Sequence, residues 1–180
     1  EKCRHDFLEF VKAMWQGFIM GRHHKILAEK FNRIAQGKLK RLIVCLPPRH
    51  SKSEFASTFF PAWMMGLNPS LKIIQATHTA ELAVRFGRRV RNIIDSEDYQ
   101  SVFPNISLSG DNKSAGRWTT NDGGEAFYSG VGGAITGRGA DLLIIDDPHS
   151  EQDAMSPTAM DGAWEWYTSG PRQRLQPGGT

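Results

Sequence analysis

The sequence predicts an α/β fold in which a mainly parallel central sheet is flanked by helices. Three apolar runs rich in β-branched residues are typical of buried strands, at 42–46, 71–77 and 142–145. Segments of helical period lie around and between these runs, as expected when parallel strands are joined by crossover helices. A β-hairpin before the third run is expected as an antiparallel addition to the sheet.

Composition agrees with a globular protein, and we expect residues 1–180 to form a single domain. Hydrophobic residues make up 39% of the chain and charged residues 23%, with neither repeats nor low-complexity segments. The net charge of +3 permits contact with nucleic acid without requiring it. Because no apolar stretch reaches the length of a bilayer span and the start lacks an apolar signal region, we predict a cytoplasmic protein with no membrane partner.

Two helices are predicted in an N-terminal element, residues 1–36. The first covers 5–20, where large apolar side chains recur at helical spacing and form a face for core packing: Phe7, Leu8, Phe10, Val11, Met14, Trp15, Phe18 and Ile19. The second covers 23–36, with four residues directed inward: Ile26, Leu27, Phe31 and Ile34. The core is then expected over 37–180, beginning with a basic turn and the strand 42–46.

The two cysteines lie in unlike settings, Cys3 near the start and Cys45 inside the first predicted strand. This arrangement predicts neither a disulfide framework nor a metal site. We expect Cys45 to be a small residue of the buried core.

Helices and strands alternate in the middle of the chain. A helix over 52–65 is stopped by the Gly, Asn and Pro residues of 66–70, and the strand 71–77 follows. The next segment, 79–94, is an amphipathic helix. Residues 95–116 are rich in Gly, Pro, Ser and Asp, so we predict that they are mostly loop.

Three arginines gather on one face of the helix predicted over 79–94, away from its apolar stripe. Arg85, Arg88 and Arg89 are spaced three and four residues apart, which places them side by side on a helix. Such a cluster suits contact with DNA phosphates or a neighbouring subunit. A solvated face is an equally good interpretation, because charge runs usually serve solvation.

A hairpin and an acidic strand close the pattern. Alternating residues at 117–120 and 126–131 flank an Asn-Asp-Gly-Gly turn, which predicts the hairpin. A glycine-rich run follows, and then the strand 142–145, which Pro148 ends. A last helix is predicted over 157–167, with an aromatic surface made by Trp164, Trp166 and Tyr167.

The turn between the first strand and the next helix has the layout of a phosphate-binding loop. A β-branched strand leads into a tight turn, and Lys-Ser stands at the start of a helix whose backbone N–H groups favour anions. In this interpretation Lys52 reaches the β- and γ-phosphates of a nucleotide and the Ser53 hydroxyl binds Mg²⁺. The residues expected to contact the nucleotide are Pro48, Arg49, His50, Ser51, Lys52, Ser53 and Glu54.

The loop departs from the usual G-x-x-x-x-G-K-[ST] pattern at both glycines. Leu46 and Ser51 occupy those places. Glycine is favoured there because it tolerates positive φ, so we expect a backbone geometry at Ser51 that a side chain can adopt. Pro47 and Pro48 stiffen the turn instead.

Paired carboxylates follow the third apolar run, 94 residues after the lysine. Asp146 and Asp147 are expected at the carboxyl end of a parallel strand, where ligands of such sheets bind. Asp146 would hold Mg²⁺ together with Ser53. Asp147 is placed to orient and deprotonate an attacking water, and Glu151 is an alternative base.

Taken together, these segments resemble the ATPase domain of the large terminase subunit of tailed bacteriophages, a P-loop NTPase of the additional-strand, catalytic-glutamate type. The resemblance is carried by four stretches: 46–54, 86–91, the glycine-rich segment 130–141, and 142–150. It implies a Mg-ATP-hydrolysing motor that drives double-stranded DNA into a viral procapsid. The implied partners are DNA, further copies of the chain in a ring, the small terminase subunit and the portal of the procapsid, all in the cytoplasm of the host.

The resemblance also implies roles for particular residues. Arg49 matches an arginine inside the family's phosphate loop, where a guanidinium suits the γ-phosphate. Arg138 matches an arginine that reaches the nucleotide of the neighbouring subunit, although pairing with Asp141 or another surface carboxylate is an alternative. His24 lies at the family's adenine-side segment. Asp147 departs from the family pattern, which has glutamate after the metal-binding aspartate.

The chain ends where the family's coupling strand would begin, and it lacks the acidic cluster of a two-metal nuclease. We therefore expect an ATPase portion without nuclease activity. Two alternatives stay open. One is a helicase-like or recombination ATPase of the same fold class, and the other is a subunit with a degenerate loop that no longer hydrolyses nucleotide and serves in assembly.

Overall fold

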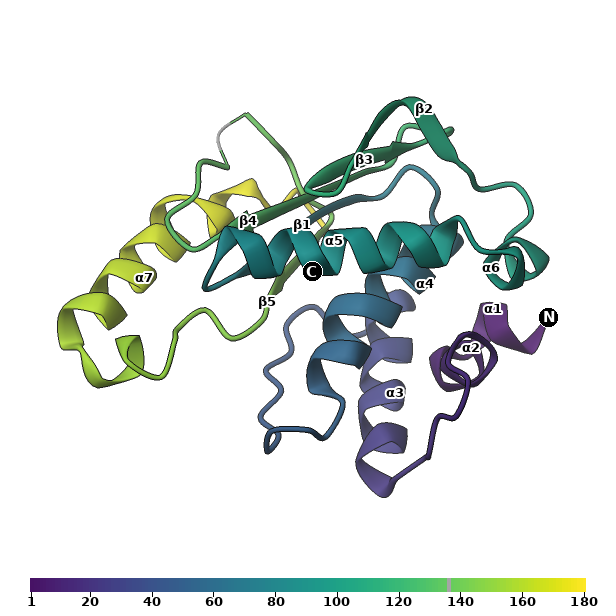
Figure 1. The fold of residues 1–180 in the computed structure, drawn as a ribbon, viewed down its shortest axis with the longest axis horizontal. Helices are drawn as coiled ribbons and strands as arrows, with labels where there is room; N and C mark the ends of the chain where they lie inside the picture. The colour runs from purple at the N-terminus through teal and green to yellow at the C-terminus, as the bar shows by residue number, and fades with distance from the viewer. Residues whose placement is uncertain (136) are drawn as a thin grey trace.

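The computed structural model describes residues 1–135 and 137–180, except for the side chains of residues 111–113. Its centre is a five-stranded sheet with the order β2-β3-β4-β1-β5 (Figure 1). The strands are β1 Lys72–Thr77, β2 Leu108–Ser114, β3 Arg117–Thr120, β4 Glu125–Gly130 and β5 Leu142–Ile145. Thr136, part of the glycine-rich run, lies outside the described residues.

The sheet is mixed rather than mainly parallel. β1 runs parallel to both of its neighbours, β4 and β5. β3 is antiparallel to β2 and to β4. The predicted hairpin of β3 and β4 is confirmed, but β4 is also an integral strand beside β1. Because β4 belongs to both a hairpin and the parallel part, the antiparallel strands continue the sheet from its centre to one edge.

Helices and loops cover both faces of this sheet (Figure 1). The α-helices are α1 Lys2–His5, α2 Phe7–Met14, α3 Arg22–Ala35, α4 Phe60–Leu67, α5 Ala80–Ile94, α6 Glu97–Val102 and α7 Pro157–Ser169. A π-helix, Glu54–Phe59, precedes α4, and short 3₁₀ turns cover Asp153–Met155 and Pro171–Arg174. Within the described residues, no helix is long and apolar enough to cross a membrane.

The larger core lies between the sheet and the helices of the first half of the chain. Phe7 is fully buried, and its ring makes edge contacts with Phe31 at 5.2 Å and with Phe55 at 5.5 Å between centroids. The opposite face carries a smaller cluster around Ile74 and Ile135, against which Trp166 of α7 packs. The aromatic residues of the N-terminal element therefore act mainly in core packing.

The N-terminal helix predicted over 5–20 is broken in two places. Asp6 adopts an extended conformation, and its carboxylate accepts a hydrogen bond of 3.0 Å from the backbone N–H of Glu9, so it caps α2. Trp15 ends α2, also in an extended conformation. The α3 prediction holds except at Ile26, which was expected to point inward and is 51% exposed.

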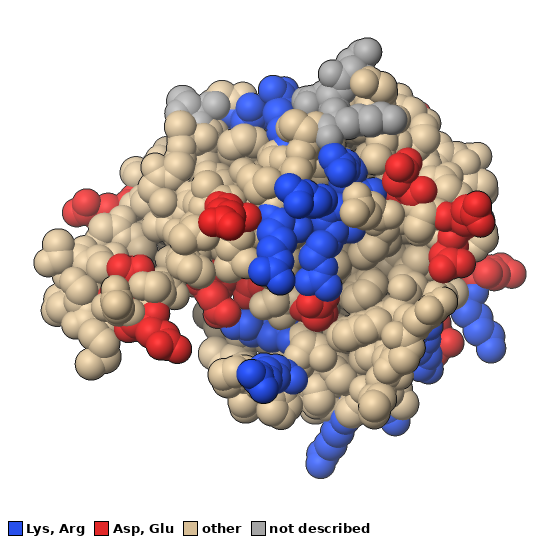
Figure 2. Space-filling model, viewed as in Figure 1, with Lys and Arg blue, Asp and Glu red and all other residues tan. Residues whose placement is uncertain are grey.

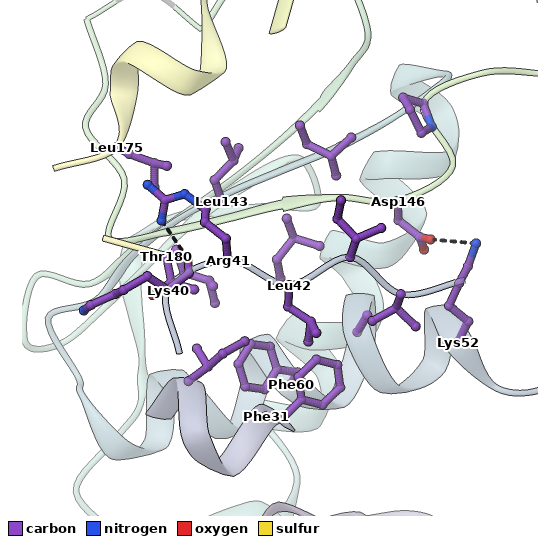
Figure 3. Close-up of a pocket in the computed structure, with 18 of the residues that line it drawn as sticks. Phe31, Lys40, Arg41, Leu42, Lys52, Phe60, Leu143, Asp146, Leu175 and Thr180 are labelled. Carbon is purple, nitrogen blue, oxygen red and sulfur yellow. Dashed lines mark hydrogen bonds and ion pairs between the residues drawn. The ribbon is translucent and has the colours of Figure 1, made fainter. Parts of the chain in front are cut away.

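The segment 42–46 is not a strand, and the prediction of a buried strand there is wrong. Leu42, Val44 and Leu46 are half-buried, whereas Ile43 is 89% exposed and Cys45 is also exposed. The segment is extended but lies apart from β5, with a pocket of about 580 Å³ between them (Figure 3). Without a backbone partner it forms no ladder, so Cys45 is not a core residue.

The outer edge of β5 is partly occupied by the end of the chain. The backbone N–H of Leu143 donates to the carbonyl of Thr180, and the N–H of Thr180 donates to the carbonyl of Asp141, both at 2.8 Å. β5 is nevertheless only partly buried, although its sequence predicted burial on both faces, because the pocket separates it from the segment 42–46. Nearby, Lys40 and Arg41 donate to carbonyls of the same tail.

The π-helix arises from Pro61, about two turns into the continuous helix 52–67. Proline has no N–H, and its ring clashes with the carbonyl four residues earlier, which belongs to Ser57. A wider turn relieves this clash. The Ser57 carbonyl instead accepts a hydrogen bond of 3.3 Å from the Gln75 side chain of β1. The helix is therefore attached to the sheet at the point where its own ladder is interrupted.

The remaining predictions are largely confirmed. β1 and α5 match the predicted strand 71–77 and helix 79–94, and α7 matches the helix over 157–167. The segment 95–116, predicted to be mostly loop, also contains α6 and β2.

Candidate functional site

The lysine of the loop and the two aspartates after β5 lie together. The Lys52 ammonium donates a hydrogen bond to the Asp147 carboxylate, and its Nζ is 3.7 Å from Oδ1 of Asp146 (Figure 3). Both aspartates follow β5 at the carboxyl edge of the parallel strands. The sequence predicted this meeting of residues that are almost a hundred positions apart.

Three residues of the site have a left-handed backbone. The φ angles are +62° at Arg49, +62° at Ser51 and +44° at Asp147. Each costs on the order of 1–3 kcal/mol in a residue other than glycine, and such conformations cluster at functional sites. Ser51 therefore keeps the conformation that a glycine would adopt there, and its side chain is accommodated in the left-handed region.

A cavity of about 580 Å³ lies over the loop. Its size falls within the usual range for small-molecule sites. Besides Trp15 and Asp147, its walls come from the loop and the helix start: Leu46, Pro47, Pro48, Arg49, Ser51, Lys52, Ser53 and Glu54. A ligand in this cavity would contact the loop on one side and the exposed carboxylate of Asp147 on the other.

Asp146 is buried and held by hydrogen bonds that the sequence did not reveal. Its side chain is 7% exposed, and Oδ2 accepts a hydrogen bond of 2.8 Å from the hydroxyl of Ser57, which is fully buried. Its backbone N–H donates to the carbonyl of Ala76 in β1 at 3.0 Å. One signal in the sequence points to Ser57: it stands four residues after Ser53, on the same side of the helix that carries the lysine.

The charges of the site stabilise the protonated lysine. Burial by itself lowers the pKa of Lys52, but the hydrogen bond to Asp147 and the negative charges of Asp147 and Asp146 outweigh it, so the pKa is raised. The ammonium is therefore charged at neutral pH and balances one of two adjacent carboxylates. An anionic ligand with several oxygens would compete with these carboxylates for it.

The donors at the site fit a magnesium ion that is bound together with phosphate. Mg²⁺ is usually held by one or two carboxylates and by oxygen atoms of the substrate, with few other protein ligands. Asp146 offers a buried carboxylate, and Ser53 offers a hydroxyl beside Lys52. Within the described residues there is no cluster of three or more His, Cys, Asp or Glu side chains suited to a metal. An all-protein cage is therefore not formed there.

Glu54, predicted to contact nucleotide, is paired with α5. The guanidinium of Arg89 donates two hydrogen bonds to its carboxylate, at 2.7 and 2.6 Å. Arg85 and Arg88 lie on the same helix and are exposed, and Figure 2 shows basic side chains gathered where α5 faces the viewer. The arginine face of α5 is thereby attached to the start of the π-helix.

His50 and His24, which were also predicted to contact the nucleotide, make polar contacts with backbone groups close to them in the sequence. Nδ1 of His50 lies 2.9 Å from the carbonyl oxygen of Pro48 within the loop. His24 is buried, its Nδ1 accepts a hydrogen bond of 2.9 Å from the N–H of Gly21, and its ring stacks on Phe55. Burial, followed by the charges of His23 and His50, lowers the pKa of His24. The structure therefore places His24 in the core, where it caps α3.

Arg138 packs on β4 near the amino ends of the parallel strands, away from the end where Asp146 lies. Its guanidinium donates to the carboxylate of Glu125 and stacks over the ring of Phe127 at 4.2 Å. Glu125 begins β4 and pairs with Lys72 at the start of β1, whereas Asp146 follows the far end of the parallel strands. Arg138 is therefore remote from Lys52 of its own chain, and its surface carboxylate is Glu125 rather than Asp141.

Glu151, the alternative base, is exposed and lies beyond the turn that follows β5. Asp147 is 63% exposed and contacts Lys52 directly. The geometry favours Asp147 over Glu151 for any chemistry next to the lysine.

Comparison of the sequence with models of known protein families and with curated proteins finds no match. The interpretation of the site therefore rests on its geometry and on the sequence motifs.

Proposed function

We propose that this chain binds Mg-ATP in the cavity over the loop and hydrolyses it. The observation that carries the proposal is the contact of Lys52 with both Asp146 and Asp147, at the junction of a loop, a helix start and the carboxyl edge of a parallel pair. A cation beside two carboxylates, under a cavity of nucleotide size, suits a triphosphate with its metal. Three left-handed residues lie in the same place, and such conformations cluster at functional sites.

Each residue has a definite task in this proposal. Phosphoryl transfer requires mainly positioning and charge stabilisation. Lys52 would neutralise the β- and γ-phosphates, and Arg49 would contact γ-phosphate oxygens through its guanidinium. Asp147 would accept a proton from the water that attacks the γ-phosphorus, while the bond to the leaving β-phosphate oxygen breaks.

Ser53 and Asp146 would hold the magnesium ion, which supplies charge neutralisation between phosphate oxygens. Ser57 keeps the carboxylate of Asp146 oriented through its hydrogen bond of 2.8 Å. Because Lys52 now contacts both aspartates, nucleotide binding would require it to exchange part of these contacts for phosphate oxygens.

We further propose that the hydrolysis drives double-stranded DNA into a viral procapsid, as in the large terminase subunits that the sequence resembles. The motif combination supports this role: the loop with Arg49, the glycine-rich segment with Arg138 and the acidic strand. In that setting the chain would act in a ring with other copies, with the small terminase subunit and the portal, in the host cytoplasm.

The position of Arg138 bears on how such a ring would work. Because it is remote from Lys52 of its own chain, it can serve the reaction only at the site of another copy. We therefore expect turnover per chain to rise with protein concentration. A fast rate that is independent of concentration in a monomeric sample would contradict a role in trans.

Calorimetric titration tests the binding step directly. A magnesium-bound, non-hydrolysable ATP analogue is titrated into the wild-type chain and into Lys52→Ala. We expect binding by the wild type and loss of at least tenfold in affinity in the variant. Equal binding by both would refute the proposed site, as would no binding by either.

A second candidate is a subunit that does not hydrolyse nucleotide and serves in assembly. One observation favours it: side chains occupy both glycine places of the loop, and Ser51 must hold a left-handed conformation. Binding of the analogue without any release of phosphate from Mg-ATP, even at high protein concentration, would select this candidate.

A further inference from the structure

Helix α7 presents an apolar and acidic face that nothing in the described structure covers. Of its 13 residues only Ala163 is buried. Met160 is 44% and Trp164 62% exposed, and their spacing of four places them side by side. Asp161 and Glu165 are exposed next to them. We call these four residues the acidic patch; α7 itself contains no basic residue.

A second exposed apolar group has the opposite charge. It lies where the chain enters α3 and includes Ile19 at 86%, Met20 at 41% and Ile26 at 51% exposure. Arg22 and Lys25 are exposed among them. We call these five residues the basic patch. Contiguous exposed apolar patches that are rimmed by polar residues mark interaction sites.

The two patches match each other in chemistry. Each has an apolar centre with large side chains, and each is flanked by two charges, negative on α7 and positive at the start of α3. Aromatic and methionine side chains such as Trp164 and Met160 are enriched in interfaces. Charges of opposite sign at the rim give specificity and steer association.

The patches lie in different parts of the molecule. α7 stands at the left of Figure 1, and α3 begins at the lower edge. Figure 2 shows acidic side chains over the region of α7 and basic side chains that project from the lower edge. One copy therefore does not satisfy its own patches by folding them together.

We infer that the acidic patch of one copy binds the basic patch of a second copy of this chain. Such a contact is heterologous, because the two surfaces differ, and it leaves one free patch on each partner. Repetition of the contact closes into a ring or continues as an open chain. The inference deepens the proposed function, which requires several copies to act together, and it names the surfaces by which they associate.

A charge-swap experiment tests the contact. Sedimentation velocity over a range of concentrations at low salt is measured for the wild type, for Asp161→Lys/Glu165→Lys and for Arg22→Glu/Lys25→Glu. We expect the wild type to associate and each double variant to have an apparent Kd at least tenfold higher, since each places like charges opposite each other. Higher salt should weaken the wild-type association.

Two further samples make the result specific. An equimolar mixture of the two double variants should associate again, because each contact then joins opposite charges. The chain with all four reversals should associate with itself. Recovery in either sample also shows that the variants are folded. As a matched control, Asp98→Lys/Asp122→Lys reverses two exposed acidic residues outside both patches and should behave as wild type.

Three results would overturn the inference: a wild-type chain that stays monomeric at every concentration, double variants that associate as the wild type does, or a mixture that fails to recover. The second result would show that copies of the chain associate through other surfaces. Titration of the ATP analogue into the wild-type chain keeps the two proposals apart. Binding of the analogue by a wild-type chain that stays monomeric rejects only the interface, and association of a wild-type chain that does not bind the analogue rejects only the nucleotide site.

Discussion

The hydrogen bond between Ser57 and Asp146 should be one of the strongest single contributions to the stability of this fold. The donor is fully buried, the acceptor side chain is 7% exposed, and the two oxygens are 2.8 Å apart. A hydrogen bond to a charged group contributes about 1.5–3 kcal/mol. Ser57→Ala also leaves a buried carboxylate oxygen without this donor, which places the expected loss at about 2–3 kcal/mol.

This loss should be visible as a lower midpoint in urea unfolding, followed by circular dichroism, with an unchanged m value. For a chain of this size it corresponds to a fall in Tm of about 4–12 °C. Among the described residues, the remaining side-chain partner of the Asp146 carboxylate is Lys52, whose Nζ is 3.7 Å from the other oxygen. Because that contact is not a hydrogen bond of normal length, it does not replace the lost donor.

The adjacent residue provides a matched control. Thr58 is also buried, but its hydroxyl finds no hydrogen-bond partner in the described part of the chain. Thr58→Val keeps the shape and removes an unsatisfied group, so it should be neutral or slightly stabilising. A loss of less than about 0.5 kcal/mol in Ser57→Ala would refute the reasoning, because a change of that size is typical of ordinary surface substitutions. An equal loss in Ser57→Ala and Thr58→Val would also refute it, because the effect would then not depend on the hydrogen bond to Asp146.

Three further predictions concern stability. Gly87→Ala places a methyl group 2.3 Å from a backbone carbonyl oxygen and should lower the midpoint of unfolding, whereas Gly162→Ala meets open space in α7 and should raise stability by about 0.5–1 kcal/mol; equal effects in thermal melts would be unexpected. The pKa of His24 is held below 6.5, so as the pH is lowered the unfolded chain binds a proton before the folded chain does. The free energy of unfolding should therefore decrease as the pH is lowered. His24→Gln keeps a hydrogen-bond acceptor and should flatten this dependence between about pH 7.5 and pH 5 in urea unfolding. The pair of Glu54 and Arg89 is partly exposed, so a double-mutant cycle should give a coupling below about 1 kcal/mol that shrinks in high salt; coupling that persists in salt would show that the pair is shielded from solvent.

Much of the fold could be predicted from periodicity, because the elements in question have strong local signals. The strand β1 and the helix α5 carry clear apolar patterns, and Thr79 caps α5 through its side chain. The segment 42–46 has an equally apolar composition but forms no ladder. A strand exists only through its hydrogen-bond partners, and those of 42–46 depend on the separation from β5. The mixed order of the sheet was not predicted for the same reason, because the pairing of β4 with β1 cannot be inferred from the sequence of either strand alone.

Part of the candidate site could be predicted from the sequence, and part could not. Lys52, Asp146 and Asp147 could be brought together from the motifs, because a loop and an acidic strand have characteristic positions at the edge of a sheet. Ser57 was missed because its role depends on a wide turn caused by Pro61. His24 was assigned from resemblance to a nucleotide contact, yet tertiary packing places it against Phe55. Contacts of this kind depend on the three-dimensional arrangement of neighbours, which no local pattern encodes.

The π-helix has a consequence for the way that motion travels through the molecule. On one side Phe55 and Phe59 contact the N-terminal aromatic residues, with the ring of Phe59 stacked 5.3 Å from that of Trp15. On the other side Ser57 holds Asp146. If this turn rewound to an α-helix with one residue fewer, every side chain after it would rotate by about 100°. Either the aromatic stack or the carboxylate would then lose its partner, so a shift of the N-terminal helices that rewound this turn would reorient the acidic centre.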